Sequence, residues 1–433
     1  MKQAYIVALI IAFTISGASK ASPIEEPDDW GEEDWGEQEQ SDLEVSHFVD
    51  LAYGHFIHDN PFTENNNSLS EVRYRLDVSN YWGGTLGSLK TDVVADNVTN
   101  KISIELREAL LSFSLGSNSD IKIGRQILTW GTGDLVFLND MFPKNWVAFF
   151  NGRAIEYLKA PSDSLKISYY NPKVNLDVVW SPIFNSDTYL NGERFSFYNP
   201  ILGELAAAPP LLTGLEPNKT IENSELAIRI YKNIKSVEWA MYAYQGFFKQ
   251  PLSYDTSIGR TRFPALQVLG ASIISPLADG LINAEFAWHN SQDDKQGNNP
   301  FIPNSQLRFL IGYEKELISR LTMNAQIYVE NTLDYNQLSA NSISPKSDIK
   351  EYRTLTTLRL SYRAYQDKLN LSLFSYYSPS DHDHYLLPKA SYRLSDRLNA
   401  ELGANIFAGE KRHTFFCQLE DNSNVYTRIR LSI

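Results

Sequence analysis

The stretch Glu71-Val72-Arg73-Tyr74-Arg75-Leu76-Asp77-Val78 alternates charged and apolar side chains at every step. Successive side chains of a β-strand point to opposite faces, so this stretch predicts a strand with one charged and one apolar face. The same two-residue alternation returns at residues 174–180, 321–330 and 352–363. The pattern predicts an all-β chain built from two-faced strands.

The alternating segments are ten to twelve residues long in most cases, and Gly, Asn, Asp, Ser or Pro bounds them. Strands of soluble proteins commonly have about 5–6 residues, whereas a tilted strand needs about 9–11 to cross a bilayer. The sequence therefore predicts a transmembrane antiparallel β-barrel of about 18 strands, an even number, as in bacterial barrels. The predicted strands are 46–58, 71–82, 88–97, 101–115, 121–130, 154–170, 174–184, 224–234, 237–248, 263–276, 281–290, 305–316, 321–331, 351–364, 369–378, 385–394, 398–407 and 424–433.

The connections between these segments also alternate in length. Short links, such as 83–87, 116–120 and 235–236, follow even-numbered segments, and the longest loops, 131–153 and 185–223, follow odd-numbered ones. Short periplasmic turns and long outer loops are the rule in outer-membrane barrels. One segment, 101–115, changes phase midway, so we expect a β-bulge near Glu108. The direction in which Arg125 points is left open by the pattern.

Composition and charge restrict the class of protein further. The 433 residues carry 39 Lys and Arg against 52 Asp and Glu, and 12% are aromatic. The chain is acidic overall and has no block of basic residues, which argues against nucleic acid as a partner. The single cysteine, Cys417, excludes an intrachain disulfide. These features fit a protein of the bacterial envelope.

Three regions follow from the sequence. Residues 1–21 have a basic Lys2, a short apolar run and a small-x-small ending, which predicts a secretory signal peptide. Residues 22–44 hold eleven carboxylates, two Asp-Trp-Gly-Glu copies and no Lys or Arg, which predicts a disordered periplasmic segment. The two tryptophans could dock a partner, or the segment could be a solvated spacer. Residues 45–433 form the predicted outer-membrane barrel.

Motifs of catalysis and metal binding are sparse. The HExxH, GxSxG, P-loop, CxxC and GxGxxG patterns are absent. Asp381-His382-Asp383-His384 could offer metal ligands, but such a run is more often simply polar. Glu285 and His289 share one strand face as in a barrel hydrolase, yet no nucleophile accompanies them. The prediction is a protein that is not an enzyme, with no catalytic residue, no metal site and no cofactor.

The run from Gly124 to Asp134, continuing through Asn139-Asp140-Met141-Phe142-Pro143-Lys144 to Gly152-Arg153, resembles porin-like Gram-negative outer-membrane barrels related to alginate-export-type proteins. The ending Glu420-Asp421-Asn422-Ser423-Asn424-Val425-Tyr426 is similar as well. The resemblance implies an outer-membrane conduit. Some relatives are encoded beside RND-type exporters, which implies an inner-membrane exporter as an alternative partner.

The predicted pore lining rests on alternation. Arg73, Arg75, Arg428 and Arg430 are expected to point inward within one patch of three neighbouring strands, because the first and last strands of a closed barrel are adjacent. Arg353 and Arg359 belong to the polar face of a further strand. Two interpretations stay open: the interior charges pair and fill the lumen, or they line a water-filled pore whose charge sets its selectivity.

The loop 131–153 is the predicted constriction. Its apolar pieces, 135–138 and 146–150, would be poorly placed in water, so the loop is expected to fold against the inner wall. Asp134 and Asp140 would then face the arginine patch; alternatively, the loop caps the barrel top. The resulting hypothesis is a channel in outer-membrane lipid for small polar or anionic solutes, or an export conduit. The alternatives are an outer-membrane component of an RND-type exporter, a barrel enzyme, or a structural or adhesive barrel.

Overall fold

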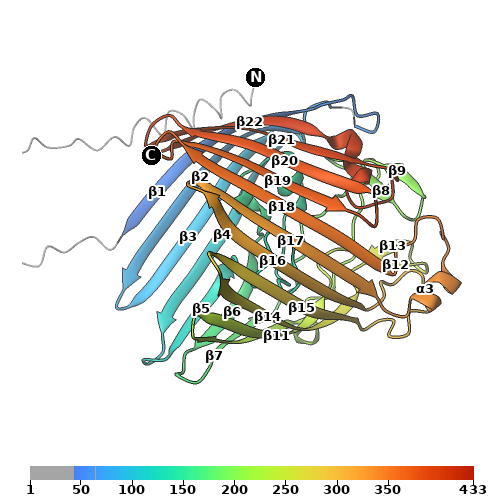
Figure 1. Cartoon of the computed structure of the whole chain (residues 1–433), viewed down its shortest axis with the longest axis horizontal. Helices are drawn as coiled ribbons and strands as arrows, with labels where there is room; N and C mark the ends of the chain where they lie inside the picture. The colour runs from blue at the N-terminus through green and yellow to red at the C-terminus, as the bar shows by residue number, and fades with distance from the viewer. Residues whose placement is uncertain (1–42, 64) are drawn as a thin grey trace, which may run out of the picture.

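The computed structural model describes residues 43–63 and 65–433. Within them, 18 strands form one antiparallel sheet that closes on itself, because β1 pairs with both β2 and β22 (Figure 1). The barrel strands are β1 (Glu44–Phe56), β2 (Leu69–Trp82), β3 (Thr85–Asp96), β4 (Lys101–Ser114), β5 (Ser119–Gln126), β6 (Ser162–Tyr169), β7 (Asn175–Ser181), β10 (Glu225–Ile234), β11 (Val237–Phe247), β14 (Ala265–Leu277), β15 (Gly280–Ser291), β16 (Gln306–Ile318), β17 (Leu321–Thr332), β18 (Tyr352–Ala364), β19 (Leu369–Ser378), β20 (Asp383–Arg393), β21 (Leu398–Gly409) and β22 (Asn424–Ser432).

The predicted 18-stranded barrel is thus confirmed, and each predicted segment overlaps one barrel strand. The largest difference is at 154–170, where β6 begins only at Ser162 because residues 154–161 belong to the preceding loop. β1 begins at Glu44, the last residue of the predicted acidic segment. The predicted signal peptide and the rest of that segment, up to residue 42, lie outside the described residues.

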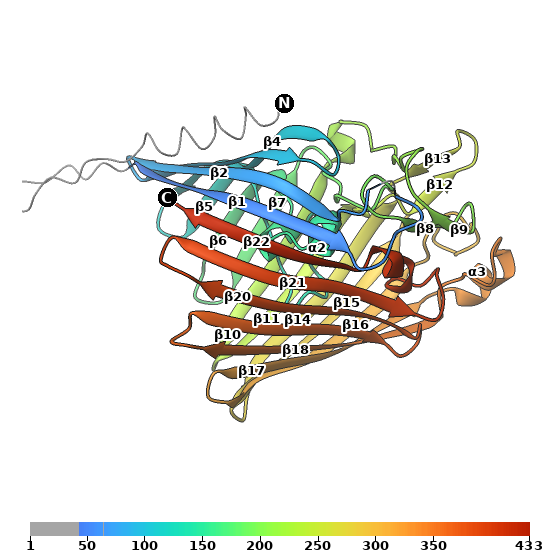
Figure 2. The ribbon, with the colours of Figure 1, turned by 90° about the horizontal axis from the view of Figure 1, so that it is seen from above.

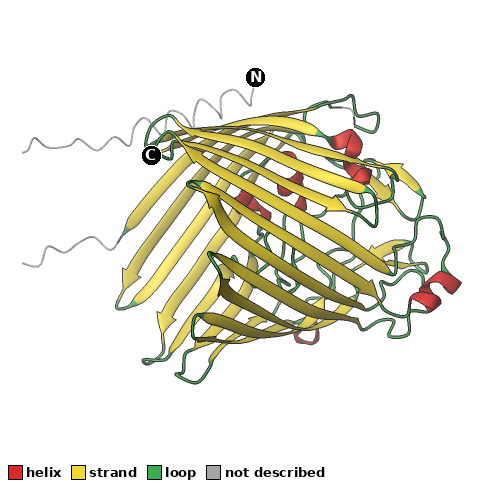
Figure 3. Cartoon of the chain, in the orientation of Figure 1, coloured by secondary structure: helices red, strands yellow, loops and turns green. Residues whose placement is uncertain are grey.

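The two ends of the barrel differ. Tight turns join the strands at the end where β1 starts and β22 finishes, and long connections fill the other end, which we call the outer end (Figures 1 and 3). Four outer loops matter below: L1 (57–68), L3 (127–161), L4 (182–224) and L9 (410–423). The elements of the loops, which are not part of the wall, are β8 (Phe197–Asn199), β9 (Glu204–Ala206), β12 (Ser253–Asp255), β13 (Arg260–Arg262), α2 (Trp146–Asn151), α3 (Tyr335–Asn341), and the 3-10 helices η1 (Ile155–Leu158), η2 (Ile221–Asn223) and η3 (Cys417–Asn422).

The two faces of the wall follow the alternation in the sequence. Ile104, Met241 and Leu402 lie on the outer face and are 77%, 67% and 63% exposed, whereas Arg73 and Asp92, on the inner face, are buried. An outward apolar band and a polar interior are the pattern of barrels that cross a membrane. Within the described residues, every helix is too short or too polar to cross a membrane.

A bulge in β4 accounts for the change of phase noted in the sequence. Lys90 of β3 pairs with Glu108 and Thr91 pairs with Leu106, so Arg107 is the extra residue. The expected bulge near Glu108 is confirmed. Its effect is to turn Arg107 into the barrel interior, where it donates to two carbonyls of L3 at 3.0 Å. A bulge often re-aims a side chain in this way.

The orientation of Arg125 is also settled. Inner-face positions on β5 and β6 are the even-numbered ones, such as Gln126 and Ser164, which are buried. Arg125 therefore lies on the outer face, where it pairs with Asp163 of β6 at 2.9 Å. It also donates to the Leu106 carbonyl at 2.7 Å, next to the bulge. Arg125 does not contribute to the lumen.

Candidate functional site

L3 runs inside the barrel, between the wall strands (Figure 2). Its helix α2 starts after Asn145, whose side-chain oxygen accepts from the Ala148 N–H at 2.8 Å. Such an N-cap satisfies one of the free N–H groups at a helix start. Gly152 ends the helix at φ 85°, in the left-handed region that glycine enters without strain. Loop and helix together cross the lumen.

An apolar core inside the lumen holds L3 in place. Leu138, Phe149 and Phe150 are 1%, 6% and 3% exposed. They pack with inner-face side chains from strands around the barrel, so the core joins the loop to the wall. The wall members include Phe56, Val179, Ala227, Tyr244, Val268, Ala287, Leu310, Tyr328, Leu355, Phe374, Tyr376, Tyr385 and Phe407. Burying one large side chain contributes about 1.5–3 kcal/mol, which offsets the entropy cost of ordering the loop. The prediction that this loop folds inward is confirmed.

Glu285 of β15 anchors the first half of L3. Its carboxylate accepts from the backbone N–H groups of Thr132 and Gly133, the latter at 2.7 Å, and from Asn139 Nδ2 at 2.9 Å. His289 lies four residues further along the same face of β15, and its Nε2 is 2.9 Å from the Leu138 carbonyl oxygen. The pair considered above as a hydrolase constellation thus positions the loop.

Asp134 is held by β17 and β18, at least four strand positions away from the arginine patch on β22, β1 and β2. Its carboxylate accepts from Arg359 of β18 at 2.6 Å, while its backbone N–H and carbonyl bond to Gln326 of β17 at 2.7 and 2.9 Å. Burial raises the pKa of Asp134, and the Arg359 guanidinium acts in the other direction. Arg359 is therefore close to the predicted constriction loop, and among the described residues its acid partner is Asp134, while its guanidinium lies over the Phe374 ring.

The second loop carboxylate, Asp140, is buried within L3. It forms an ion pair with Lys144 at 3.1 Å and accepts from Thr129 at 2.9 Å. The expectation that Asp134 and Asp140 face the four arginines is therefore wrong. The physical reason is that backbone groups of L3 need partners inside the lumen, and Gln326 and Glu285 supply them on β17 and β15.

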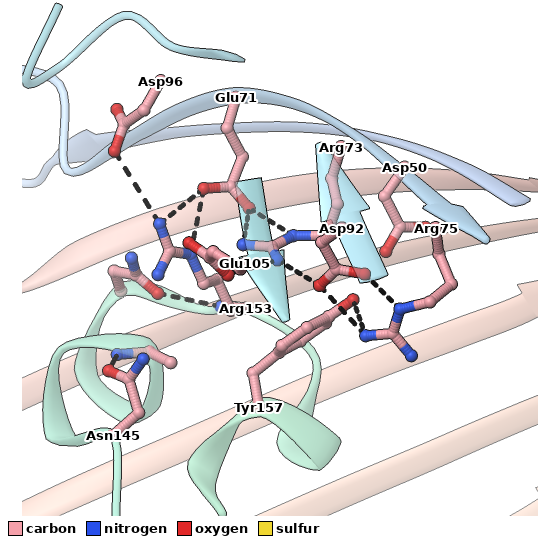
Figure 4. A network of polar contacts seen from close by, with 12 residues as sticks. Asp50, Glu71, Arg73, Arg75, Asp92, Asp96, Glu105, Asn145, Arg153 and Tyr157 are labelled. Atoms are coloured by element: carbon pink, nitrogen blue, oxygen red, sulfur yellow. Dashed lines mark hydrogen bonds and ion pairs between the residues drawn. The ribbon is translucent and has the colours of Figure 1, made fainter. Parts of the chain in front are cut away.

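Arg73 and Arg75 point into the barrel, and their acid partners come from the wall itself (Figure 4). Both pair with the fully buried Asp92 of β3, and Arg73 also reaches Glu105 of β4 at 2.8 Å. Tyr157 of η1 accepts from Arg75 at 2.8 Å, and its ring lies under the Arg73 guanidinium. This face of the interior is a packed ion-pair network.

The end of L3 joins that network through Arg153. Its Nη2 and Nε groups both donate to Oε2 of Glu71 on β2, at 2.7 and 2.9 Å. Hydrogen bonds between two charged groups are stronger than those between neutral groups. Arg194 of L4, which is buried, pairs with Asp96 on the neighbouring strand. Arg153 Nη2 lies 3.7 Å from Oδ2 of the same carboxylate (Figure 4). L3 and L4 are thus tied to one carboxylate pair.

Arg428 and Arg430 of β22 lie beside this patch, as the adjacency of the first and last strands requires. Arg430 donates to Asp50 of β1 at 2.7 Å and to Glu156 of L3 at 2.7 Å, while Arg428 pairs with Glu401 at 2.9 Å. Burial raises the pKa of Glu156, but the Arg430 guanidinium acts in the opposite direction, and the net effect is that the pKa of Glu156 is lowered. Asp50 is in register with both Arg430 and Arg73, so it separates the two arginine rows.

Arg353 and residues 381–384 make structural contacts at the outer rim of the barrel. Arg353 pairs with Asp381 at 2.9 Å. The buried Asp383 carboxylate accepts from the Phe416 N–H at 2.8 Å and so holds L9. In the described part of the chain, His, Cys, Asp and Glu side chains form no group of three suited to a metal ion.

Sequence reasoning missed Arg107, Arg153, Arg194 and Tyr157. Arg107 could be found from the bulge, since the change of phase marks the residue that changes face. The other three are in loops, where alternation gives no direction for a side chain. Their partners are set by the path of L3 and L4 through the lumen.

Two solved structures have a similar architecture. OccAB4 of Acinetobacter baumannii is 10% identical and matches with a TM-score of 0.54, covering 92% of this chain and 100% of that one. OccD3 (OpdP) of Pseudomonas aeruginosa is 8% identical, with a TM-score of 0.52 and 90% of each chain covered. The chain has the porin fold of the bacterial outer membrane. No family model and no curated protein matches it, so the alginate-export resemblance has no support beyond the residues that suggested it.

Proposed function

We propose that the chain is an outer-membrane channel for small polar or anionic solutes, with L3 as its constriction. The observation that carries this proposal is the course of L3, which is bonded to β15, β17 and β18 on one side and to β2 and β22 on the other. A solute that crosses the barrel has to pass this loop.

The charges that remain accessible support the choice of solute. The side chains of Arg359, Lys389 and Arg430 are 36%, 32% and 26% exposed on the inner face. Arg73 and Arg75, by contrast, are buried against Asp92. The side chains of Glu105 and Glu156 in the lumen are 39% and 43% exposed, so charges of both signs are accessible. Such charges attract polar and dipolar solutes, and fields are strong in a narrow space with low-dielectric walls. Arg359 and Arg430 both contact L3, so they lie at the constriction.

The test is conductance and reversal potential of the purified protein in a planar bilayer under a KCl gradient. We expect ion-conducting steps, and we expect Arg359→Ala and Arg430→Ala to shift selectivity toward cations. Lys315→Ala is the matched control, because Lys315 pairs with Asp279 at a turn outside the lumen. Absence of current in every variant would reject the channel, and unchanged selectivity in both arginine variants would reject the constriction.

The arginine pair of β2 is less suited to this test. Removing Arg73 and Arg75 would leave Asp92 buried without a counter-charge, which typically costs about 3–5 kcal/mol. A change of conductance in that variant could arise from damage to the fold. The described residues offer no observation that favours an exporter partner, an enzyme or an adhesive barrel over the channel.

A further inference from the structure

Three outer loops meet at a buried asparagine at the outer end of the barrel, beside the ends of β1 and β22. The Asn422 side-chain oxygen, in L9, accepts from Asn60 of L1 at 2.7 Å and from the backbone N–H of Ser196 in L4 at 3.1 Å. Its amide nitrogen donates to the Ser196 carbonyl at 2.8 Å. Asn60, Ser196 and Asn422 are at most 4% exposed. We call these three joined loops the lid.

The same asparagine is connected to the constriction loop. Asn424 donates from Nδ2 to the Asn422 carbonyl at 2.9 Å and to the Phe150 carbonyl of α2 at 3.1 Å. Asn405 of β21 donates to the Asn424 side-chain oxygen at 2.9 Å, and the Tyr385 hydroxyl donates to Asn405 at 2.7 Å. These buried groups form a continuous hydrogen-bonded chain from the lid to the end of α2.

A second joint ties L4 to the start of α2. Asp187 accepts from the Lys144 backbone N–H and from the Trp146 indole N–H, both at 2.8 Å. Thr188 exchanges backbone hydrogen bonds with the same stretch, at 2.8 and 2.9 Å. Helix α2 is therefore held at its start by L4 and at its end by Asn424.

Both joints consist of buried polar groups, and this determines how they can break. A buried amide that loses its partner costs about 1–3 kcal/mol, and networks of such groups in a low dielectric form and break together. The lid cannot lift without leaving Asn422 and Ser196 without partners, and L3 cannot leave the wall without breaking the bond between Asn424 and the Phe150 carbonyl. Each movement lowers the cost of the other.

We propose that the lid and L3 are one cooperative gate, coupled through Asn422 and Asn424. This inference rests on the proposed channel function, in which L3 is the constriction. A solute or ligand that binds the lid from outside and displaces Asn60 or Ser196 from Asn422 would then favour release of α2 inside the barrel. The ending Glu420–Tyr426, which sequence analysis singled out, is the segment that carries the coupling.

The test is amide hydrogen exchange measured by mass spectrometry on the full chain in nanodiscs. Asn422→Ala removes the side-chain hydrogen bonds that join L9 to L1 and L4. Among the described residues, the Asn422 side chain makes no hydrogen bond to L3. We expect exchange in α2, residues 146–151, to rise by about fivefold or more, the change in equilibrium that one lost buried hydrogen bond produces. Asn66→Ala is the control, because Asn66 is in L1 and the one hydrogen bond of its side chain to the described residues is the exposed bond to Asp59 at 2.8 Å.

Coupling has to act in both directions, since a coupling free energy is reciprocal. Asn424→Ala should therefore raise exchange in the lid, at residues 57–63 and 194–197, as well as in α2. Faster exchange confined to the loop nearest each substitution would overturn the proposal. If Asn422→Ala lowers the yield of folded barrel, two milder changes cut the same joint: Asn60→Ala removes the Nδ2 bond to Asn422, and Ser196→Ala removes the bond from Ser196 Oγ to Asn422 Oδ1 at 3.2 Å. Exchange does not depend on conduction, so a protein without current but with reciprocal exchange would refute the channel and leave the coupling intact.

Discussion

The anchor at Glu285 gives the sharpest prediction. Replacing Glu285 with Ala removes the only acceptor that the described residues offer to the Thr132 and Gly133 backbone N–H groups, whereas Asn139 keeps a bond to the Phe286 carbonyl at 3.2 Å. Two hydrogen bonds to a charged acceptor are therefore lost without replacement. The wall strand itself keeps its backbone pairing with β14 and β16.

The expected magnitude follows from these two bonds. A hydrogen bond to a charged group contributes about 1.5–3 kcal/mol. Water can enter the space that the side chain leaves, so we take the lower figure for each bond. The sum is about 3 kcal/mol, which is roughly a hundredfold in the equilibrium between docked and released L3. Glu285→Gln should cost less, because its amide oxygen still accepts from both N–H groups.

The assay is hydrogen exchange of residues 131–140, together with heat-modifiable migration on gels as a check of the folded barrel. Glu285→Ala should exchange up to a hundredfold faster in this stretch, with migration unchanged. Glu316→Ala is the matched control on the neighbouring strand, since the Glu316 carboxylate accepts from the Arg320 N–H at 2.7 Å in the turn that follows β16. Wild-type exchange rates at 131–140 in a folded Glu285→Ala barrel would refute the anchoring role.

Three further predictions concern other contacts of the loops. A Cβ at Gly152 would overlap the Tyr426 ring, and an alanine there would have to keep the backbone φ of 85°. Gly152→Ala should therefore raise amide hydrogen exchange in α2, and exchange equal to that of the wild type would contradict this close contact. Because the pKa of Glu156 is lowered by Arg430, this ion pair contributes stability above the unfolded pKa of about 4.5. That contribution is lost as pH falls through the lower folded pKa, and Glu156→Gln should remove this acid dependence of L3 exchange. Burial raises the pKa of the Cys417 thiol to about 11, so maleimide labelling at pH 8 should be slow until the protein is denatured, and rapid labelling of the folded protein would exclude a buried thiol.

The strand pattern could be read from the sequence because it is a local property. Alternation decides which face each side chain takes, so the 18 strands, the inward arginines and the bulge in β4 follow from residues next to one another. Closure then places β22 beside β1, which brings Arg430 and Arg73 to either side of Asp50. Even the inward folding of L3 is indicated by its apolar composition.

The partners of those side chains were decided by the tertiary structure. Asp134 contacts Arg359 across 225 positions of sequence, and Asn424 reaches the Phe150 carbonyl across 274. A loop has no periodicity, so its sequence shows that it must bury apolar groups but not which wall positions will accept its N–H and carbonyl groups. Those positions depend on the polar side chains of several strands together, and the strands are brought to the same space only in the closed barrel.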